Sequence, residues 1–212
     1  MQFEEQISKL SKWNLSKKQN PSLIEKIFLN PVILILIVIA LLLSTTFNSK
    51  NTISDAEIAL SNSMVYFERG DFDNAALQLS SIINQYPRSS QALQASFYLG
   101  RISFINGENE EAISYLVSSA GKLDYDVLNK EAYLILGQIT PTLKEAIKYF
   151  DTALRFTNSE NEIAFITIYK AKRLAQDGSI AEAKSVLDSL DISDISYREF
   201  YEEVYGYVVS QS

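Results

Sequence analysis

The chain has 212 residues, contains no cysteine and no histidine, and carries a formal net charge of −7 at pH 7. Because thiolate nucleophiles, disulfides, imidazole bases and most zinc or copper sites need these residues, we expect no enzyme, metal or cofactor. Residues 1–50 hold six Lys and Arg against three Asp and Glu, whereas residues 51–212 hold thirteen against twenty-three, and this acidic balance predicts no binding of nucleic acid.

Residues 1–29 form a basic segment that we expect to be a cytoplasmic tail. Four apolar residues recur in it at helical spacing: Phe3, Ile7, Leu10 and Trp13. Lys9 and Lys12 lie among them. The pattern is compatible with a short helix on the surface of an anionic membrane and equally with a disordered tail.

Residues 30–48 are predicted to form one transmembrane signal anchor. Residues 32–43 are all apolar and uncharged, and a helix over 31–48 would be about 27 Å long, enough for a thin bilayer. Lysines are concentrated before this segment and only Lys50 follows closely, which predicts a cytoplasmic N-terminus and an extracytoplasmic remainder. The alternative is a cleaved signal peptide, against which stand the long preceding segment and the lack of a small-residue cleavage motif.

Residues 49–53 are expected to be a linker, and residues 54–212 contain an internal repeat. The segment Gly70 to Ala75 (GDFDNA) recurs thirty-seven residues later as GENEEA, and Leu99-Gly100 recurs at the same spacing as Leu136-Gly137. Small residues at these positions would let two antiparallel helices approach closely, while larger apolar residues fill the space between helix pairs.

At five places in the repeat region, a Ser or Thr followed three residues later by Glu marks a predicted helix start. This capping pattern predicts helix starts at Ser54, Thr142, Ser159, Ser179 and Ser196. The helix after Ser196 has one apolar face, formed by Phe200, Tyr201, Val204, Tyr205 and Val208. We predict that it caps the end of the array, with a partner-binding helix as the alternative.

The small residues, turn glycines and spacing resemble the tetratricopeptide (TPR) repeat, although no unit begins with the tryptophan of that pattern. The resemblance implies an all-α, TPR-like α-solenoid of about four helical hairpins with a C-terminal capping helix, whose first helices line a concave face. The repeat register places on this partner-binding face Leu60, Met64, Phe67, Phe97, Arg101, Phe104, Leu134, Gln138 and Lys172. Several of the aromatic side chains could instead belong to the core.

One membrane span followed by a short acidic TPR domain resembles the YfgM-like ancillary subunits of the bacterial Sec translocon. That resemblance implies a plasma-membrane protein whose domain faces the periplasm and binds translocon subunits, chaperones or client chains, with no small-molecule substrate. Three alternatives stay open: a self-associating envelope scaffold, a regulatory subunit of a membrane enzyme, and a secreted TPR protein of the cell-envelope assembly type. The last is suggested by the segments Gly70 to Ala75 and Gln85 to Pro87.

Overall fold

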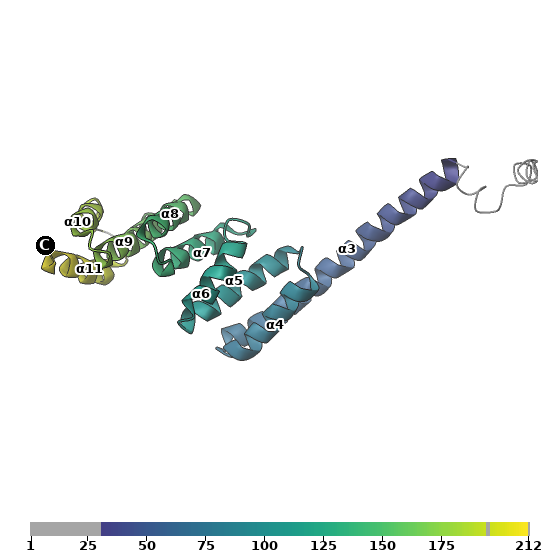
Figure 1. Cartoon of the computed structure of the whole chain (residues 1–212), viewed down its shortest axis with the longest axis horizontal. Coiled ribbons are helices and arrows are strands. Elements are labelled where there is room, and N and C mark those ends of the chain that lie inside the picture. The colour runs from purple at the N-terminus through teal and green to yellow at the C-terminus, as the bar shows by residue number, and fades with distance from the viewer. Residues whose placement is uncertain (1–30, 194–195, 212) are drawn as a thin grey trace, which may run out of the picture. The chain divides into compact units, whose positions relative to one another are not determined.

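The structure is a computed structural model that describes residues 31–193 and 196–211. These residues form helices and no strand, which confirms the predicted all-α class. In chain order the helices are α3 (Pro31–Glu68), α4 (Phe72–Gln85), α5 (Ser90–Ile105), α6 (Asn109–Ser119), α7 (Asp126–Ile139), α8 (Leu143–Ala153), the short 3-10 helix η1 (Leu154–Phe156), α9 (Glu160–Gln176), α10 (Ile180–Asp188) and α11 (Arg198–Ser210) (Figure 1).

The chain divides into two compact units, Met1–Thr52 and Ile53–Ser212. The predicted tail, residues 1–29, lies outside the described residues, and residues 31–52 belong to α3. Ser54 also lies inside α3, so the predicted helix start there is wrong. Residues 49–53 contain neither proline nor glycine to interrupt a helix. Among the residues that the structure describes, no helix is long and apolar enough to cross a membrane.

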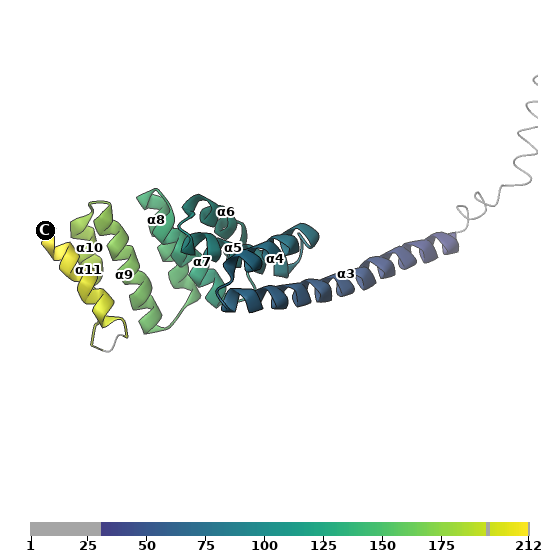
Figure 2. The same ribbon diagram turned by 90° about the horizontal axis from the view of Figure 1, so that it is seen from below.

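Helices of the second unit pack as consecutive pairs: the C-terminal part of α3 with α4, α5 with α6, α7 with α8, and α9 with α10 (Figure 2). Three of these pairs turn at a glycine, Gly70, Gly107 or Gly178, with φ of 75°, 80° and 87°. At each turn the residue after the glycine donates its N–H to the carbonyl five residues earlier, at 2.8 to 3.0 Å. This closure needs a residue in the left-handed backbone conformation, which glycine adopts without steric cost.

The α7–α8 pair turns differently, through Thr140, Pro141 and Thr142. Proline ends α7, and Thr142 occupies the N-cap of α8, as predicted. The Thr142 hydroxyl, however, donates to the Glu145 carboxylate at 2.8 Å rather than bonding to the helix backbone. The predicted start of α8 is therefore confirmed, but the reciprocal capping box is not formed.

Two of the other predicted caps lie at the expected positions but lack the expected hydrogen bonds. Ser159 and Ser179 occupy the N-caps of α9 and α10 without side-chain cap bonds. The N-cap of α11 is Tyr197, one residue after the predicted Ser196. Side-chain caps form instead at Asp71 and Ser89, which accept N–H groups of α4 and α5 at 3.4 and 3.1 Å.

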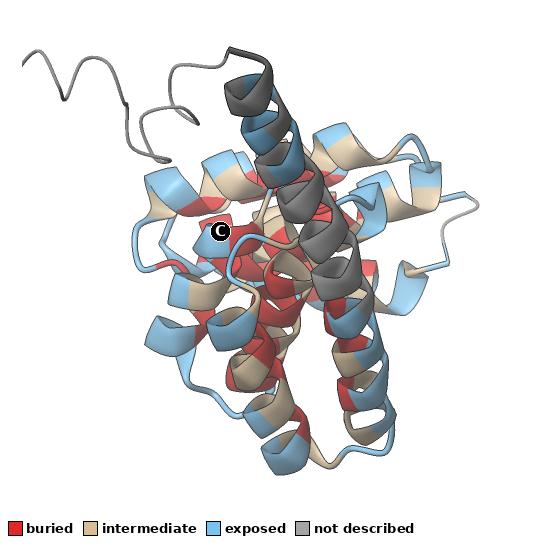
Figure 3. Ribbon diagram, turned by 90° about the vertical axis from the view of Figure 1, so that its right-hand side faces the viewer, coloured by how far each residue is buried: buried red, intermediate tan, exposed pale blue. Residues whose placement is uncertain are grey.

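Small residues bring the two helices of a pair into direct contact. Four alanines of the second helices are fully buried: Ala75, Ala112, Ala146 and Ala183. A Cβ atom added to Gly100 would lie 2.6 Å from Leu116 Cγ, and one added to Gly137 would lie 2.7 Å from Phe150 Cε1. Buried residues gather where helices face one another (Figure 3).

The C-terminal helix α11 packs against α9 and α10. Its Tyr201, Val204 and Val208 are buried in one cluster with side chains of those two helices, and Phe200 and Tyr205 pack against that cluster half-buried. The predicted apolar face therefore covers the last helix pair, as a capping helix must.

Replacing Gly137 with Ala should force the buried Phe150 ring to move, whereas Gly206 on α11 has no neighbouring atom within 4 Å of an added Cβ. Both changes gain helix propensity, so the difference between them isolates the overpacking cost. We expect the Gly137→Ala chain to be less stable than the Gly206→Ala chain by about 1–3 kcal/mol in urea unfolding. Equal stability of the two variants would contradict the close approach of α7 and α8.

Candidate functional site

The first helix of each pair lies next to the first helix of the following pair. Contacts join α5 to α7, α7 to α9, and α9 to α11. We call the surface that these helices share with residues 53–68 of α3 the first-helix face. Because a ligand lying across it would touch several repeats at once, this face is the candidate functional site.

One ion pair crosses each junction between α5, α7, α9 and α11. Arg101 Nε lies 2.8 Å from Glu131 Oε1, Lys130 pairs with Glu162, and Lys172 Nζ lies 3.6 Å from Glu203 Oε1. All three pairs are partly exposed to solvent, so each contributes about 1 kcal/mol or less to stability. They fix which side chains of neighbouring helices face each other rather than holding the fold together.

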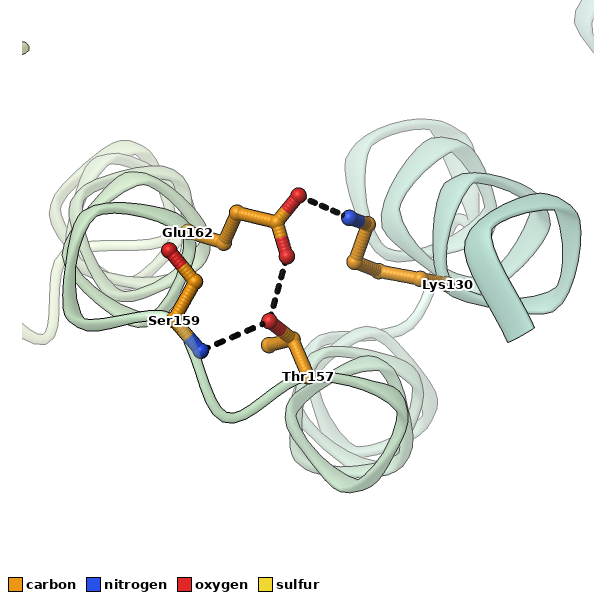
Figure 4. A network of polar contacts seen from close by, with 4 residues as sticks. All are labelled: Lys130, Thr157, Ser159 and Glu162. Carbon is orange, nitrogen blue, oxygen red and sulfur yellow. Dashed lines mark hydrogen bonds and ion pairs between the residues drawn. The ribbon is translucent and has the colours of Figure 1, made fainter.

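Glu162 sits at the centre of a small polar network near the start of α9 (Figure 4). One carboxylate oxygen accepts from Lys130 of α7, and the other accepts from the Thr157 hydroxyl. Thr157 in turn accepts the Ser159 N–H at 3.1 Å. The hydrogen bonds from Lys130 and then Thr157 lower the pKa of the Glu162 carboxyl below its ordinary value. Glu162 therefore joins two helix pairs instead of capping its own helix.

Two hollows lie on this face. The first, which we call the apolar hollow, has a volume of about 210 Å³ and is lined by Val127, Lys130, Glu131, Leu134, Glu162, Phe165, Ile166 and Tyr197. The second, which we call the cationic hollow, has a volume of about 410 Å³ and is lined by Phe104, Asn109, Gln138, Ile139, Tyr169, Lys172, Arg173 and Gln176. The cationic hollow thus has two positive side chains and no carboxylate among its lining residues.

Four of the predicted binding residues line these hollows. Phe104, Gln138 and Lys172 come from three successive first helices and meet in the cationic hollow. Leu134 lines the apolar hollow. The repeat register therefore brings together side chains that lie more than thirty residues apart in the sequence.

Phe97 is different: its side chain is 0 % exposed and packs with Leu116, Ala132 and Leu136 in the core. Its prediction as a partner-binding residue is wrong, because α5 lies between α4, α6 and α7 and buries much of its circumference. Leu60 is likewise buried in the core.

Arg101, Phe67 and Met64 are half-buried. The Arg101 guanidinium lies 5.1 Å from the Phe67 ring centroid and 5.8 Å from that of Phe97, in addition to its ion pair with Glu131. This cation is therefore already held between two rings and a carboxylate. Arg101 and Phe67 link α3, α5 and α7 at the start of the face.

The repeat register missed Phe165, Tyr169, Arg173 and Gln176, all of which line the hollows from α9. Lys172 is the one residue of this helix that the register predicted to lie on the face. Steps of three or four residues from Lys172 along the helix lead to Phe165, Tyr169 and Gln176. Helical periodicity around one predicted position would have found them.

The structure predicts unequal losses of stability when two phenylalanines of the same helix are replaced by alanine. Phe97→Ala should lower the free energy of unfolding by about 3–5 kcal/mol, because it leaves a cavity in the core. Phe104→Ala should cost less, about 1–2 kcal/mol, since its half-buried ring lines a hollow. Urea unfolding of both chains measures the difference, and equal losses would contradict the separation of core from face.

The Glu162 network predicts a pH-dependent contribution to stability. A carboxyl whose pKa is lowered by folding stabilises the protein above its ordinary pKa, and the gain is lost as the pH falls through the lowered value. Because Glu162 is 40 % exposed, Glu162→Gln should cost only about 1 kcal/mol or less at neutral pH, and nothing at about pH 2.

Glu160→Gln supplies the matched control, since Glu160 lies exposed in the same first turn of α9. Urea unfolding at several pH values should show a shrinking gap between the two variants as the pH falls. A gap that is absent at neutral pH, or that persists in acid, would contradict the ion pair with Lys130.

Among the described residues, no group of three or more Asp and Glu side chains is arranged to hold a metal ion. Comparison with protein families found no family model that matches the chain. Comparison with curated proteins found no match either. Any function assigned to the chain therefore rests on its own residues and on the first-helix face.

Proposed function

We propose that this chain is a membrane-anchored, TPR-like interaction protein that binds partner or client polypeptides on its first-helix face. The observation that carries the proposal is the pair of hollows along α7 and α9, which side chains from neighbouring helix pairs line together. Concave surfaces that combine aromatic rings with a few polar groups are typical of peptide-binding sites. Three aromatic side chains on α9 and its neighbours, Phe165, Tyr169 and Tyr197, supply such rings here.

The TPR-like character of the proposal rests on three repeated features. The sequence repeats after thirty-seven residues, three helix pairs close through the same glycine turn, and glycine or alanine lies where paired helices touch. The absence of histidine and cysteine supports a binding role over catalysis.

The anchor and the location are proposed from the sequence. Twelve uncharged apolar residues at 32–43 and the lysines before them support a single span with a cytoplasmic N-terminus. The repeats would then act on the extracytoplasmic side of the plasma membrane. We propose that the domain lies beside the protein-translocation channel and that its partners are chaperones or emerging chains.

A photo-crosslinking amino acid at Gln138 in the native membrane tests the binding proposal. Gln138 lines the cationic hollow, and Glu182, exposed on the second helix α10, is the control position. Irradiation should give polypeptide adducts at position 138 and few at position 182. Equal adducts at both positions, or none at 138, would contradict a binding site on this face.

The same sample also tests self-association and membrane orientation. Adducts of two copies of the chain would favour a self-associating scaffold over a client-binding protein. Protease added to spheroplasts before lysis should digest the repeats and release the adducts, and protection of residues 53–212 would contradict the proposed orientation.

A further inference from the structure

Both hollows take lining residues from α7 and α9, and we call the surface that these residues share the α7–α9 trough. On both helices the residues of the apolar hollow precede those of the cationic hollow: 127–134 before 138–139 on α7, and 162–166 before 169–176 on α9. On α9, the lining residues recur every three or four positions from Glu162 to Gln176, so they share one helix face. Phe165 and Tyr169 join the two hollows, with ring centroids 5.0 Å apart.

The distance between the hollows follows from helix geometry. On both helices the centres of the two lining sets are about eight residues apart, which is about 12 Å at 1.5 Å per residue. An extended chain rises about 3.3 Å per residue, so about four residues span this distance. Side chains four residues apart on an extended chain point to the same side, and both would enter the trough.

The charge of the trough changes along its length. Lys172 Nζ lies 3.6 Å from Glu203, beyond hydrogen-bonding distance, and donates no hydrogen bond within the described part of the chain. Arg173 lies beside it, reaches Asp177 at 3.7 Å, and donates from Nη2 to the backbone carbonyls of Thr140 and Pro141 at 3.3 and 2.9 Å. Because Lys172 donates no such bond and Arg173 adds a second positive charge beside it, the cationic hollow favours an anionic group, although residues 51–212 hold thirteen Lys and Arg against twenty-three Asp and Glu.

We propose that the α7–α9 trough binds an extended segment of a partner polypeptide with a large apolar side chain in the apolar hollow and an Asp or Glu, four residues away, in the cationic hollow. This inference rests on the proposed function and adds the chemistry and spacing of the bound segment. A helical segment would need about seven or eight residues between the two groups to cover the same distance. Spacing therefore distinguishes an extended ligand from a helical one.

The test uses the full chain in detergent micelles and end-blocked fluorescent peptides of Ser and Gly that carry one Leu and one Asp. The two residues are placed two, four or seven positions apart, in both orders, and fluorescence anisotropy measures the affinity. A peptide with four-residue spacing should bind most tightly. Changing its Asp to Asn should weaken binding about tenfold, as expected for the loss of a charge-assisted hydrogen bond.

Lys172→Gln should cause the same tenfold loss, and Lys170→Gln is the matched control. Lys170 lies on the same helix, carries the same charge, does not line the trough and pairs with Asp151 at 2.7 Å. At the other end, Val127→Ser removes an exposed apolar side chain of the apolar hollow and should weaken binding severalfold with no change in melting temperature.

Tightest binding at seven-residue spacing, affinity independent of spacing, or equal effects of Lys170→Gln and Lys172→Gln would each overturn the inference. Absence of binding by every peptide would also overturn it. If adducts at Gln138 still form in the native membrane while the spacing rule fails, the proposed function stands and only this inference falls.

Discussion

The close approach of paired helices at Gly100 and Gly137 is the contact on which the other features depend. Leu116 and Phe150 occupy the space that a side chain at these glycines would need. Each of these large residues then completes a core cluster together with the neighbouring helix pair. Among the described helices, each core cluster draws on more than one pair or on α11, so stability comes from stacking of neighbours. Stacking in this register is what aligns α5, α7 and α9 side by side.

Because of that alignment, the exposed side chains of the first-helix face contribute little to the stability of the fold. The core lies between the helices of each pair and between successive pairs, whereas the face is joined by partly exposed ion pairs. Such pairs add little stability, and salt weakens them further. Phe104 and Lys172 can therefore serve recognition without a large cost to folding, which Phe97 cannot.

Much of this arrangement follows from the sequence, because glycine turns and small residues have narrow physical roles. The turns at Gly70, Gly107 and Gly178 were predictable, as was the proline turn before Thr142. Ser54 was misassigned, since a Ser-x-x-Glu pattern also occurs inside helices. Glu162 shows the related limit: local spacing predicts a cap, but Lys130, thirty-two residues away, determines its bonding. A repeat register places residues along a helix but does not give their burial, so it cannot separate the buried Phe97 from the accessible Phe104.

Single-cysteine variants test the placement of the first-helix face most directly, because the chain has no cysteine of its own that would react. Cysteines placed singly at Val127, Ile135, Leu136, Gln138 and Lys172 can be labelled with a maleimide in the folded protein. Labelling should be fast at 127, 138 and 172, which line the trough, and slow at 135 and 136, which are buried. Fast labelling at 135 or 136, or protection at 138 and 172, would contradict the placement of the first-helix face.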